Sequence, residues 1–166
     1  MLDSLFEQSR EHSIARIWIF SDLQQALPEM AEDCLARALE DILPLSKGFT
    51  HLWCLGDAME GSQIDRVTRM VQMQVDRLKP LGLPLRFIMG NHDLDCTSRL
   101  PPGSTPVLPV WEAFRQVPDW KTTATPDAFW FSETIGPVRV VFLSDHVAPD
   151  NSWLATQQEA RGEFPD

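Results

Sequence analysis

Polar side chains with oxygen or nitrogen donor atoms follow three short apolar segments of the chain, at intervals of about 35 residues. They are Asp22 and Gln24, then Asp57, and finally Asn91, His92 and Asp93. Such donors suit Mn²⁺, Fe²⁺, Zn²⁺ or Mg²⁺ rather than thiolate chemistry. Two such ions roughly 3.5–4 Å apart clamp a phosphoryl group and lower the pKa of a bound water. These residue types are therefore suited to binding divalent metal ions, and two such ions could act on a phosphoryl group, if the fold brings the side chains together.

The apolar segments that precede these side chains predict buried strands at 17–20, 51–55 and 85–89, because they are short and rich in β-branched and aromatic residues. Between them, apolar residues recur every three to four positions, which predicts two amphipathic helices. The first stripe comprises Met30, Cys34, Leu35, Ala38, Leu39 and Ile42. The second comprises Ile64, Val67, Val71, Val75 and Leu78.

This alternation predicts an α/β domain that begins βαβαβ. Parallel strands joined by right-handed crossovers have their carboxyl ends at one edge of the sheet. The polar residues that follow each strand should therefore converge, although they are far apart in the sequence. Gly56 and Gly90 would let the backbone turn sharply and approach bound metals closely.

The second half of the chain has a less regular pattern. The proline-rich stretch 94–109 predicts a loop or lid without regular structure that borders the site. Residues 129–131 and 138–143 predict a strand pair joined near Gly136-Pro137. Residues 153–160 predict one more helix.

Three motifs make the resemblance to a known family specific. In order and spacing, Asp22-Leu23-Gln24, Gly56-Asp57 and Gly90-Asn91-His92-Asp93 resemble the calcineurin-like metallophosphoesterase superfamily. The resemblance implies a layered α/β sandwich with two divalent metal ions. It further implies that Asp22 binds the first metal, Asp57 bridges both and Asn91 binds the second. His92 would be the general acid or a phosphate contact, steered by Asp93.

The chain departs from the family pattern at two places. Gln24 stands where the family usually has a metal-binding His, and it would offer an amide oxygen instead. The family's later His ligands, including a Gly-His-x-His motif, have no match here. We therefore expect 1–166 to be a single, C-terminally truncated phosphoesterase domain. His146 follows the last predicted strand and is a minor candidate ligand, because a lone His there is more often structural.

Each motif taken alone has a simpler explanation. Asp22 could cap a helix or form a turn, Gly56-Asp57 is a common turn signal, and Gly90-Asn91 suits a left-handed turn. Their occurrence at three successive strand ends favours a functional site. His51 precedes its strand and should lie at the opposite edge of the sheet, outside the site.

Charge and cysteine content narrow the partners. With 14 basic and 24 acidic residues, the formal net charge of -10 argues against nucleic-acid or anionic-membrane binding through bulk electrostatics. Three cysteines without metal-ligand spacing argue against a disulfide framework or a zinc knuckle. A soluble cytoplasmic protein acting on a small phosphate ester is expected.

Three functions remain open at this point. The first is a hydrolase in which a metal-activated water attacks a phosphomonoester or phosphodiester. The second is a non-catalytic metal- or phosphate-binding module that retains half of the site, as Gln24 and the missing histidines suggest. The third is an interaction domain without a metal.

Overall fold

The computed structural model describes residues 14–24, 28–58, 64–94, 108–123 and 130–144. The helical segments are α2 (Pro28–Ile42), η1 (Leu43–Gly48), α3 (Ile64–Leu78), η2 (Lys79–Leu81), α4 (Asn91–Leu94) and α5 (Leu108–Phe114). The strands are β1 (Ile17–Phe20), β2 (His51–Cys54), β3 (Leu85–Phe87), β4 (Lys121–Thr122), β5 (Trp130–Ile135) and β6 (Val138–Leu143). Within these described residues, no helix combines the length and apolarity that crossing a membrane requires.

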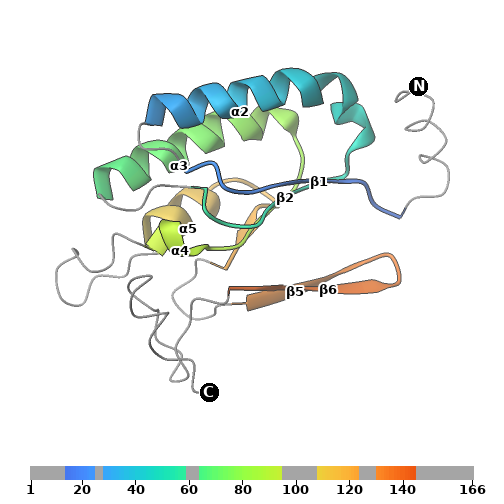
Figure 1. Ribbon diagram of the computed structural model, residues 1–166. Coiled ribbons are helices and arrows are strands. Elements are labelled where there is room, and N and C mark those ends of the chain that lie inside the picture. The colour runs from blue at the N-terminus through green and yellow to red at the C-terminus, as the bar shows by residue number, and fades with distance from the viewer. Residues whose placement is uncertain (1–13, 25–27, 59–63, 95–107, 124–129, 145–166) are drawn as a thin grey trace, which may run out of the picture.

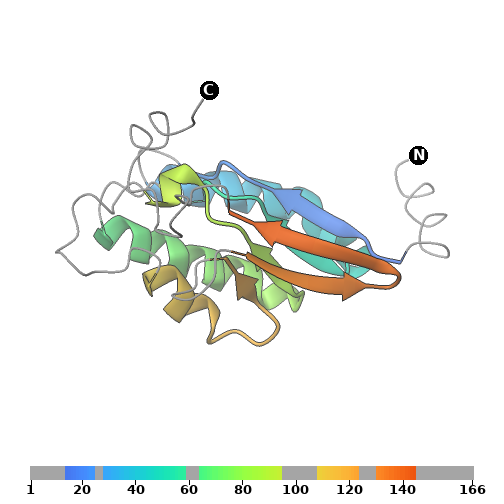
Figure 2. The ribbon, with the colours of Figure 1, turned by 90° about the horizontal axis from the view of Figure 1, so that it is seen from below.

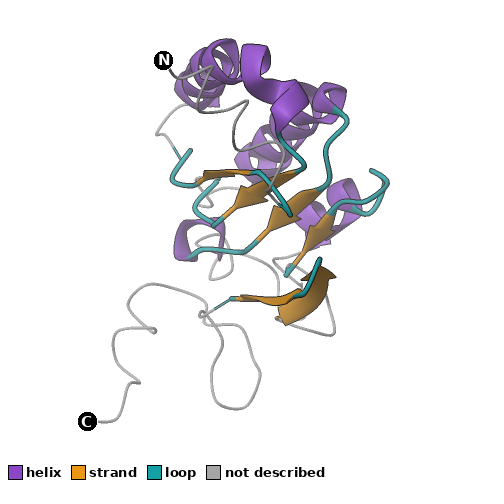
Figure 3. Ribbon diagram, turned by 90° about the vertical axis from the view of Figure 1, so that its right-hand side faces the viewer, coloured by secondary structure: helices purple, strands orange, loops and turns teal. Residues whose placement is uncertain are grey.

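A parallel sheet with strand order β1-β2-β3-β4 forms the centre of the fold. Because the chain adds each new strand on the same side of the previous one, right-handed crossovers place α2 and α3 on one face. The antiparallel hairpin β5-β6 lies on the other face (Figures 1 and 3). The layered α/β sandwich that the sequence predicts, with its βαβαβ start, is confirmed.

The main core lies between the sheet and the helix layer. Alternate residues of the central strands point into it, Leu52 and Cys54 from β2 and Leu85 and Phe87 from β3. They meet the apolar faces of the three longer helices and the turn after α5. The helical side of this core comprises Ala31, Leu35, Leu39, Met70, Val71, Val75, Leu78, Phe114, Val117 and Trp120.

The buried face of α2 differs from the predicted stripe at two positions. Met30 is exposed at 49% and Cys34 is also exposed, whereas Ala31 is fully buried. The helix is therefore rotated so that Ala31, Leu35 and Leu39 face the sheet. The small side chain of Ala31 lets the start of the helix pack closely. The predicted stripe of α3 is correct at Val71, Val75 and Leu78.

Helix α5 and strand β4 are elements that the sequence pattern did not predict, as are the short segments η1, η2 and α4. Helix α5 begins at Leu108, so the last two residues of the predicted loop are helical, and Pro109 occupies the first helical turn, where its missing N–H costs nothing. Strand β4 has only two residues and adds to β3. Residues 95–107 of the predicted loop and the predicted helix at 153–160 lie outside the described residues.

The hairpin forms where the sequence predicts it. Ile135 pairs with Val138, so Gly136 and Pro137 form a two-residue connection, and Gly136 adopts the left-handed φ of 57° that such tight turns favour. Figure 2, seen from the hairpin side, shows β5 and β6 running alongside the strands of the sheet. Phe142 packs edge-on against Trp53 of β2, with ring centroids 5.0 Å apart.

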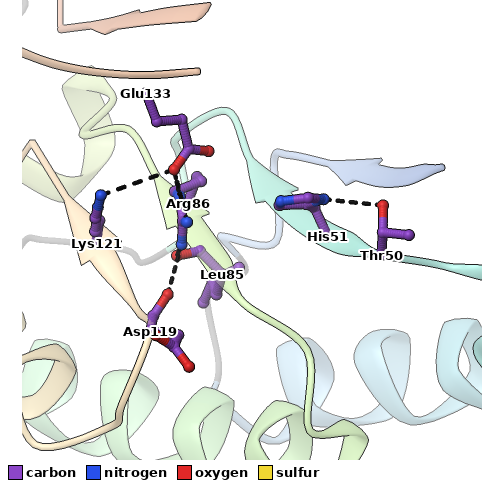
Figure 4. A network of polar contacts seen from close by, with 7 residues as sticks. All are labelled: Thr50, His51, Leu85, Arg86, Asp119, Lys121 and Glu133. Atoms are coloured by element: carbon purple, nitrogen blue, oxygen red, sulfur yellow. Dashed lines mark hydrogen bonds and ion pairs between the residues drawn. The ribbon is translucent and has the colours of Figure 1, made fainter. Parts of the chain in front are cut away.

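A buried ion pair joins the hairpin to the parallel sheet (Figure 4). The guanidinium of Arg86 on β3 lies 2.6 Å from a carboxylate oxygen of Glu133 on β5, and the side chains are only 8% and 11% exposed. Arg86 also donates to the carbonyl oxygen of Asp119 at 2.5 Å. Lys121 approaches the same carboxylate at 3.8 Å.

His51 lies near this ion pair at the amino end of β2, the edge opposite the strand ends that precede Asp22 and Asp57. One of its ring nitrogens, Nδ1, is 2.9 Å from the Thr50 hydroxyl (Figure 4). Burial, and next the Arg86 charge, lower the pKa of His51. The prediction that His51 stays outside the site is therefore consistent with its place in the fold.

The ion pair should govern docking of the hairpin. Arg86→Met leaves the buried Glu133 carboxylate with Lys121, at 3.8 Å, in place of its close guanidinium partner, and should lower the free energy of unfolding by about 3–5 kcal/mol in urea titrations. The double variant Arg86→Met with Glu133→Leu removes both charges and should recover much of this loss. An equal loss in the single and double variants would contradict the assignment.

Candidate functional site

The ends of β1 and β2 stay paired beyond the strands themselves. Leu55 N–H donates to Phe20 O at 2.9 Å, and Asp22 N–H donates to Gly56 O at 3.2 Å. Further on, Gln24 N–H donates to Asp57 O at 3.0 Å. The backbone therefore holds Asp22, Gln24 and Asp57 at one edge of the sheet, as the sequence predicts.

Asp22 and Asp57 share an uncommon backbone conformation. Their φ angles are 57° and 51°, in the left-handed region that residues other than glycine rarely adopt, although Asp tolerates it better than most. Both residues follow a strand closely: Asp22 lies two residues after the end of β1, and Asp57 lies three residues after the end of β2. Such sparsely populated conformations cluster at functional sites, and here each one redirects a carboxylate at the strand end.

Two glycines allow the turns after β2 and β3 to touch. A Cβ atom on Gly90 would lie 2.2 Å from Asp57 Oδ1 and 2.5 Å from Asp57 N. A Cβ atom on Gly56 would lie 2.8 Å from Gly90 N, and Gly56 also has a φ of 100°. Because no side chain fits at either place, both glycines are required for the close approach of Asp57 to the end of β3.

The carboxylate of Asp93 joins the same two turns from within. It is 1% exposed, and its Oδ2 accepts hydrogen bonds from Asp57 N–H at 3.0 Å and from Gly90 N–H at 2.8 Å. In the opposite direction, His92 N–H donates to Asp57 Oδ1 at 2.9 Å. We call Asp57, Gly90, His92 and Asp93 the strand-end interlock, because these three bonds fix the ends of β2 and β3 to each other.

Negative charge accumulates at this edge. Burial raises the pKa of the Cys54 thiol, and the charges of Asp93, Asp57 and Asp22 raise it further. The thiol beneath the site therefore stays protonated and is a poor metal ligand. A cation bound among these carboxylates would relieve their mutual repulsion.

The donor set fits hard divalent cations. Asp22 is exposed, with one carboxylate oxygen contacting the hydroxyl of Ser21. The amide oxygen Oε1 of Gln24 is buried and has no hydrogen-bond partner in the described structure. Together with Asp57, these side chains offer oxygen donors at one edge, which is the chemistry that Mg²⁺ and Mn²⁺ favour.

Some predicted site residues cannot be placed fully. Asn91 begins α4 beside the interlock, but its side chain is not among the described atoms, and His146 lies wholly outside the described residues. Within the described part of the chain, no group of three His, Cys, Asp or Glu side chains is arranged to hold a metal ion. These groups do not include Gln24 and Asn91, because they are amides and do not belong to those four residue types.

Two hydroxyl side chains brace the site, and no sequence pattern predicted this role. Thr123, just after β4, accepts a hydrogen bond from Met89 N–H at 2.9 Å, and Ser144, just after β6, donates to Met89 O at 3.0 Å. Both hydroxyl residues are buried. They hold the backbone that precedes Gly90 from two further strands. Only their positions directly after strand ends could have suggested this role.

The fold is an α/β sandwich whose parallel sheet carries an acidic, glycine-dependent cluster at its carboxyl edge. A family model described as calcineurin-like phosphoesterase matches residues 15–162. The chain therefore belongs to the calcineurin-like phosphoesterase family, whose members are typically metal-dependent phosphoesterases. A search of curated proteins finds no match to the chain.

Removing the Asp93 carboxylate should separate the two turns. Asp93→Ala leaves two N–H groups, those of Asp57 and Gly90, without their acceptor, and each unsatisfied buried group costs about 1–3 kcal/mol. Urea unfolding in the presence of EDTA measures this loss of stability directly. Asp76→Ala, which removes an exposed carboxylate on α3, is the control and should change stability by less than about 0.5 kcal/mol.

A side chain at position 90 should displace the Asp57 carboxylate. Gly90→Ala places a methyl group where Asp57 Oδ1 lies, so both stability and metal affinity should fall. Gly82→Ala is the matched control, because its Cβ meets nothing within 4 Å and only its left-handed φ of 64° costs about 1–2 kcal/mol. Calorimetric Mn²⁺ titration should separate them, since Gly82→Ala keeps wild-type affinity. Wild-type affinity in Gly90→Ala would contradict the steric account.

Proposed function

We propose that the protein is a phosphoesterase that hydrolyses a phosphomonoester or phosphodiester at the carboxyl edge of the parallel sheet, with two divalent metal ions as cofactors. The observation that carries this proposal is the strand-end interlock. It holds the Asp57 carboxylate between two strand ends at the place where the family resemblance puts the bridging ligand.

The metal-binding roles follow from the positions of the side chains. Asp22 and Gln24 extend from the end of β1, and Asp57 lies between them and the turn after β3. Asp57 Oδ1 accepts the His92 N–H, and the Asp57 carboxylate would contribute to holding both ions. Asn91 would complete the second position. When bound, the ions would supply a nucleophilic water and neutralise the charge of the phosphoryl group.

His92 is proposed to contact the phosphate or to protonate the leaving oxygen. Its backbone is fixed by the bond to Asp57, and its side chain is half-buried at the first turn of α4. The bond keeps the backbone of His92 beside Asp57. A positioned general acid typically contributes about 10²–10⁴-fold to the rate.

The Asp93 carboxylate supports the site through the backbone. Its two bonds to N–H groups hold Asp57 and Gly90, so it positions the bridging ligand. The predicted steering of His92 by Asp93 stays a prediction.

Hydrolysis of chromogenic phosphate esters by the full-length protein tests the function. With Mn²⁺ present, p-nitrophenyl phosphate and its bis-ester distinguish monoesterase from diesterase activity. Asp57→Asn should lose both metal affinity and turnover, because it removes the charge of the bridging carboxylate. His92→Ala should retain metal affinity and lose about 10²–10⁴-fold in turnover.

Asp76→Asn, an exposed substitution on α3, is the control and should behave as wild type. Equal turnover in wild type, Asp57→Asn and His92→Ala would reject the assigned roles. Metal binding by a wild-type protein without any hydrolysis would instead favour a metal- or phosphate-binding module.

A further inference from the structure

The amide oxygen of Gln24 is a buried acceptor without a donor. Its atom Oε1 is inaccessible to solvent and has no hydrogen-bond partner in the part of the chain that the structure describes. Gln24 is nonetheless held in place, since its backbone N–H donates to Asp57 O at 3.0 Å. A fixed, buried and unsatisfied carbonyl oxygen destabilises the folded state.

Another buried glutamine shows the usual arrangement. Gln74 on α3 is 1% exposed, and its amide Nε2 donates to Ala58 O at 2.7 Å. That side chain fastens α3 to the turn after β2 and has an evident structural role. Gln24 Oε1 has no equivalent bond, so packing and hydrogen bonding within the described structure do not account for it.

The surroundings of Gln24 favour a cation as the missing partner. Asp22 lies two residues before Gln24, and Asp57 is its backbone partner on the neighbouring segment. The charges of both carboxylates raise the pKa of Cys54, after burial and the charge of Asp93. An amide oxygen is a hard, neutral donor, which suits Mn²⁺ and Mg²⁺, whereas an imidazole nitrogen strengthens binding of Zn²⁺.

We propose that Gln24 sets the metal preference of this site, favouring Mn²⁺ or Mg²⁺ over Zn²⁺ relative to the same site with histidine, and that it does so at the expense of the metal-free fold. The inference rests on the proposed function, because it requires a metal at the carboxyl edge. It goes further by assigning cofactor selectivity to one side chain and by linking metal binding to stability.

The proposal predicts changes of opposite sign. Gln24→Leu removes the unsatisfied oxygen while keeping a similar volume, so the variant should unfold at a higher urea concentration than wild type in EDTA. The same variant should lose at least about tenfold in Mn²⁺ affinity, because a ligand is gone. If Gln24 had only a structural role, its removal would not produce both effects, a more stable metal-free protein and weaker metal binding.

Calorimetric titration with Mn²⁺ and Zn²⁺ tests the selectivity. Gln24→His should raise Zn²⁺ affinity more than Mn²⁺ affinity, shifting their ratio by at least about tenfold. The matched control is Gln116→His, which introduces an imidazole at an exposed position just after α5 and should leave the ratio unchanged.

The outcomes separate this proposal from the proposed function. Wild-type binding of Mn²⁺ together with unchanged affinities in Gln24→Leu and Gln24→His would overturn the Gln24 assignment alone. Absence of Mn²⁺ and Mg²⁺ binding by the wild-type protein would overturn both. A lower urea midpoint of Gln24→Leu in EDTA would reject the link between metal binding and stability.

Discussion

The buried carboxylate of Asp93 is the interaction on which the site depends. One oxygen joins two strand ends that are far apart in the sequence, because it accepts the N–H groups of both Asp57 and Gly90. A buried carboxylate is costly unless charge-assisted hydrogen bonds satisfy it, and backbone N–H groups do so without adding side chains to the site.

The same principle of shared backbone contacts explains the position of the other elements. Thr123 and Ser144 attach the ends of β4 and β6 to Met89, so the hairpin layer is fixed to the site as well as to the sheet. Arg86 in the middle of β3 and Glu133 on β5 form the second attachment. The hairpin is therefore attached to β3 itself and to the backbone that follows it.

Sequence patterns predicted the elements whose signals are local. The three strands and the hairpin turn at Gly136 followed from apolar runs and turn chemistry, and the convergence of Asp22 and Asp57 followed from the topology. The predicted burial was wrong for β1, because it is an edge strand and its Ile19 is 51% exposed. Strand β4 was missed because two residues are too few for any periodic pattern. Helix α5 was missed because Pro109 resembles a loop residue, although a proline is acceptable in the first turn of a helix.

The candidate site was predictable in its residues more than in its contacts. The motifs that contain Asp22, Asp57 and Asn91 identified which residues lie at the edge. The backbone bonds of Asp93 depend on two strands meeting, and no sequence pattern indicates them. The rotation of α2 that buries Ala31 in place of Met30 is a further case, since both positions fit an amphipathic helix and only close packing on the sheet separates them.

The strand order β1-β2-β3-β4 has a consequence for how the chain folds. Each strand of the parallel sheet pairs with the strand that precedes it along the chain. No strand must wait for a distant segment, so the sheet can grow from its N-terminal edge in the order in which the ribosome releases it. The edge that carries Asp22, Asp57 and Asp93 has formed once β3 and α4 have emerged, and Thr123 and Ser144 brace it later. A nascent chain therefore presents these three carboxylates at an early stage, and a cation bound there, as proposed above, would favour further folding.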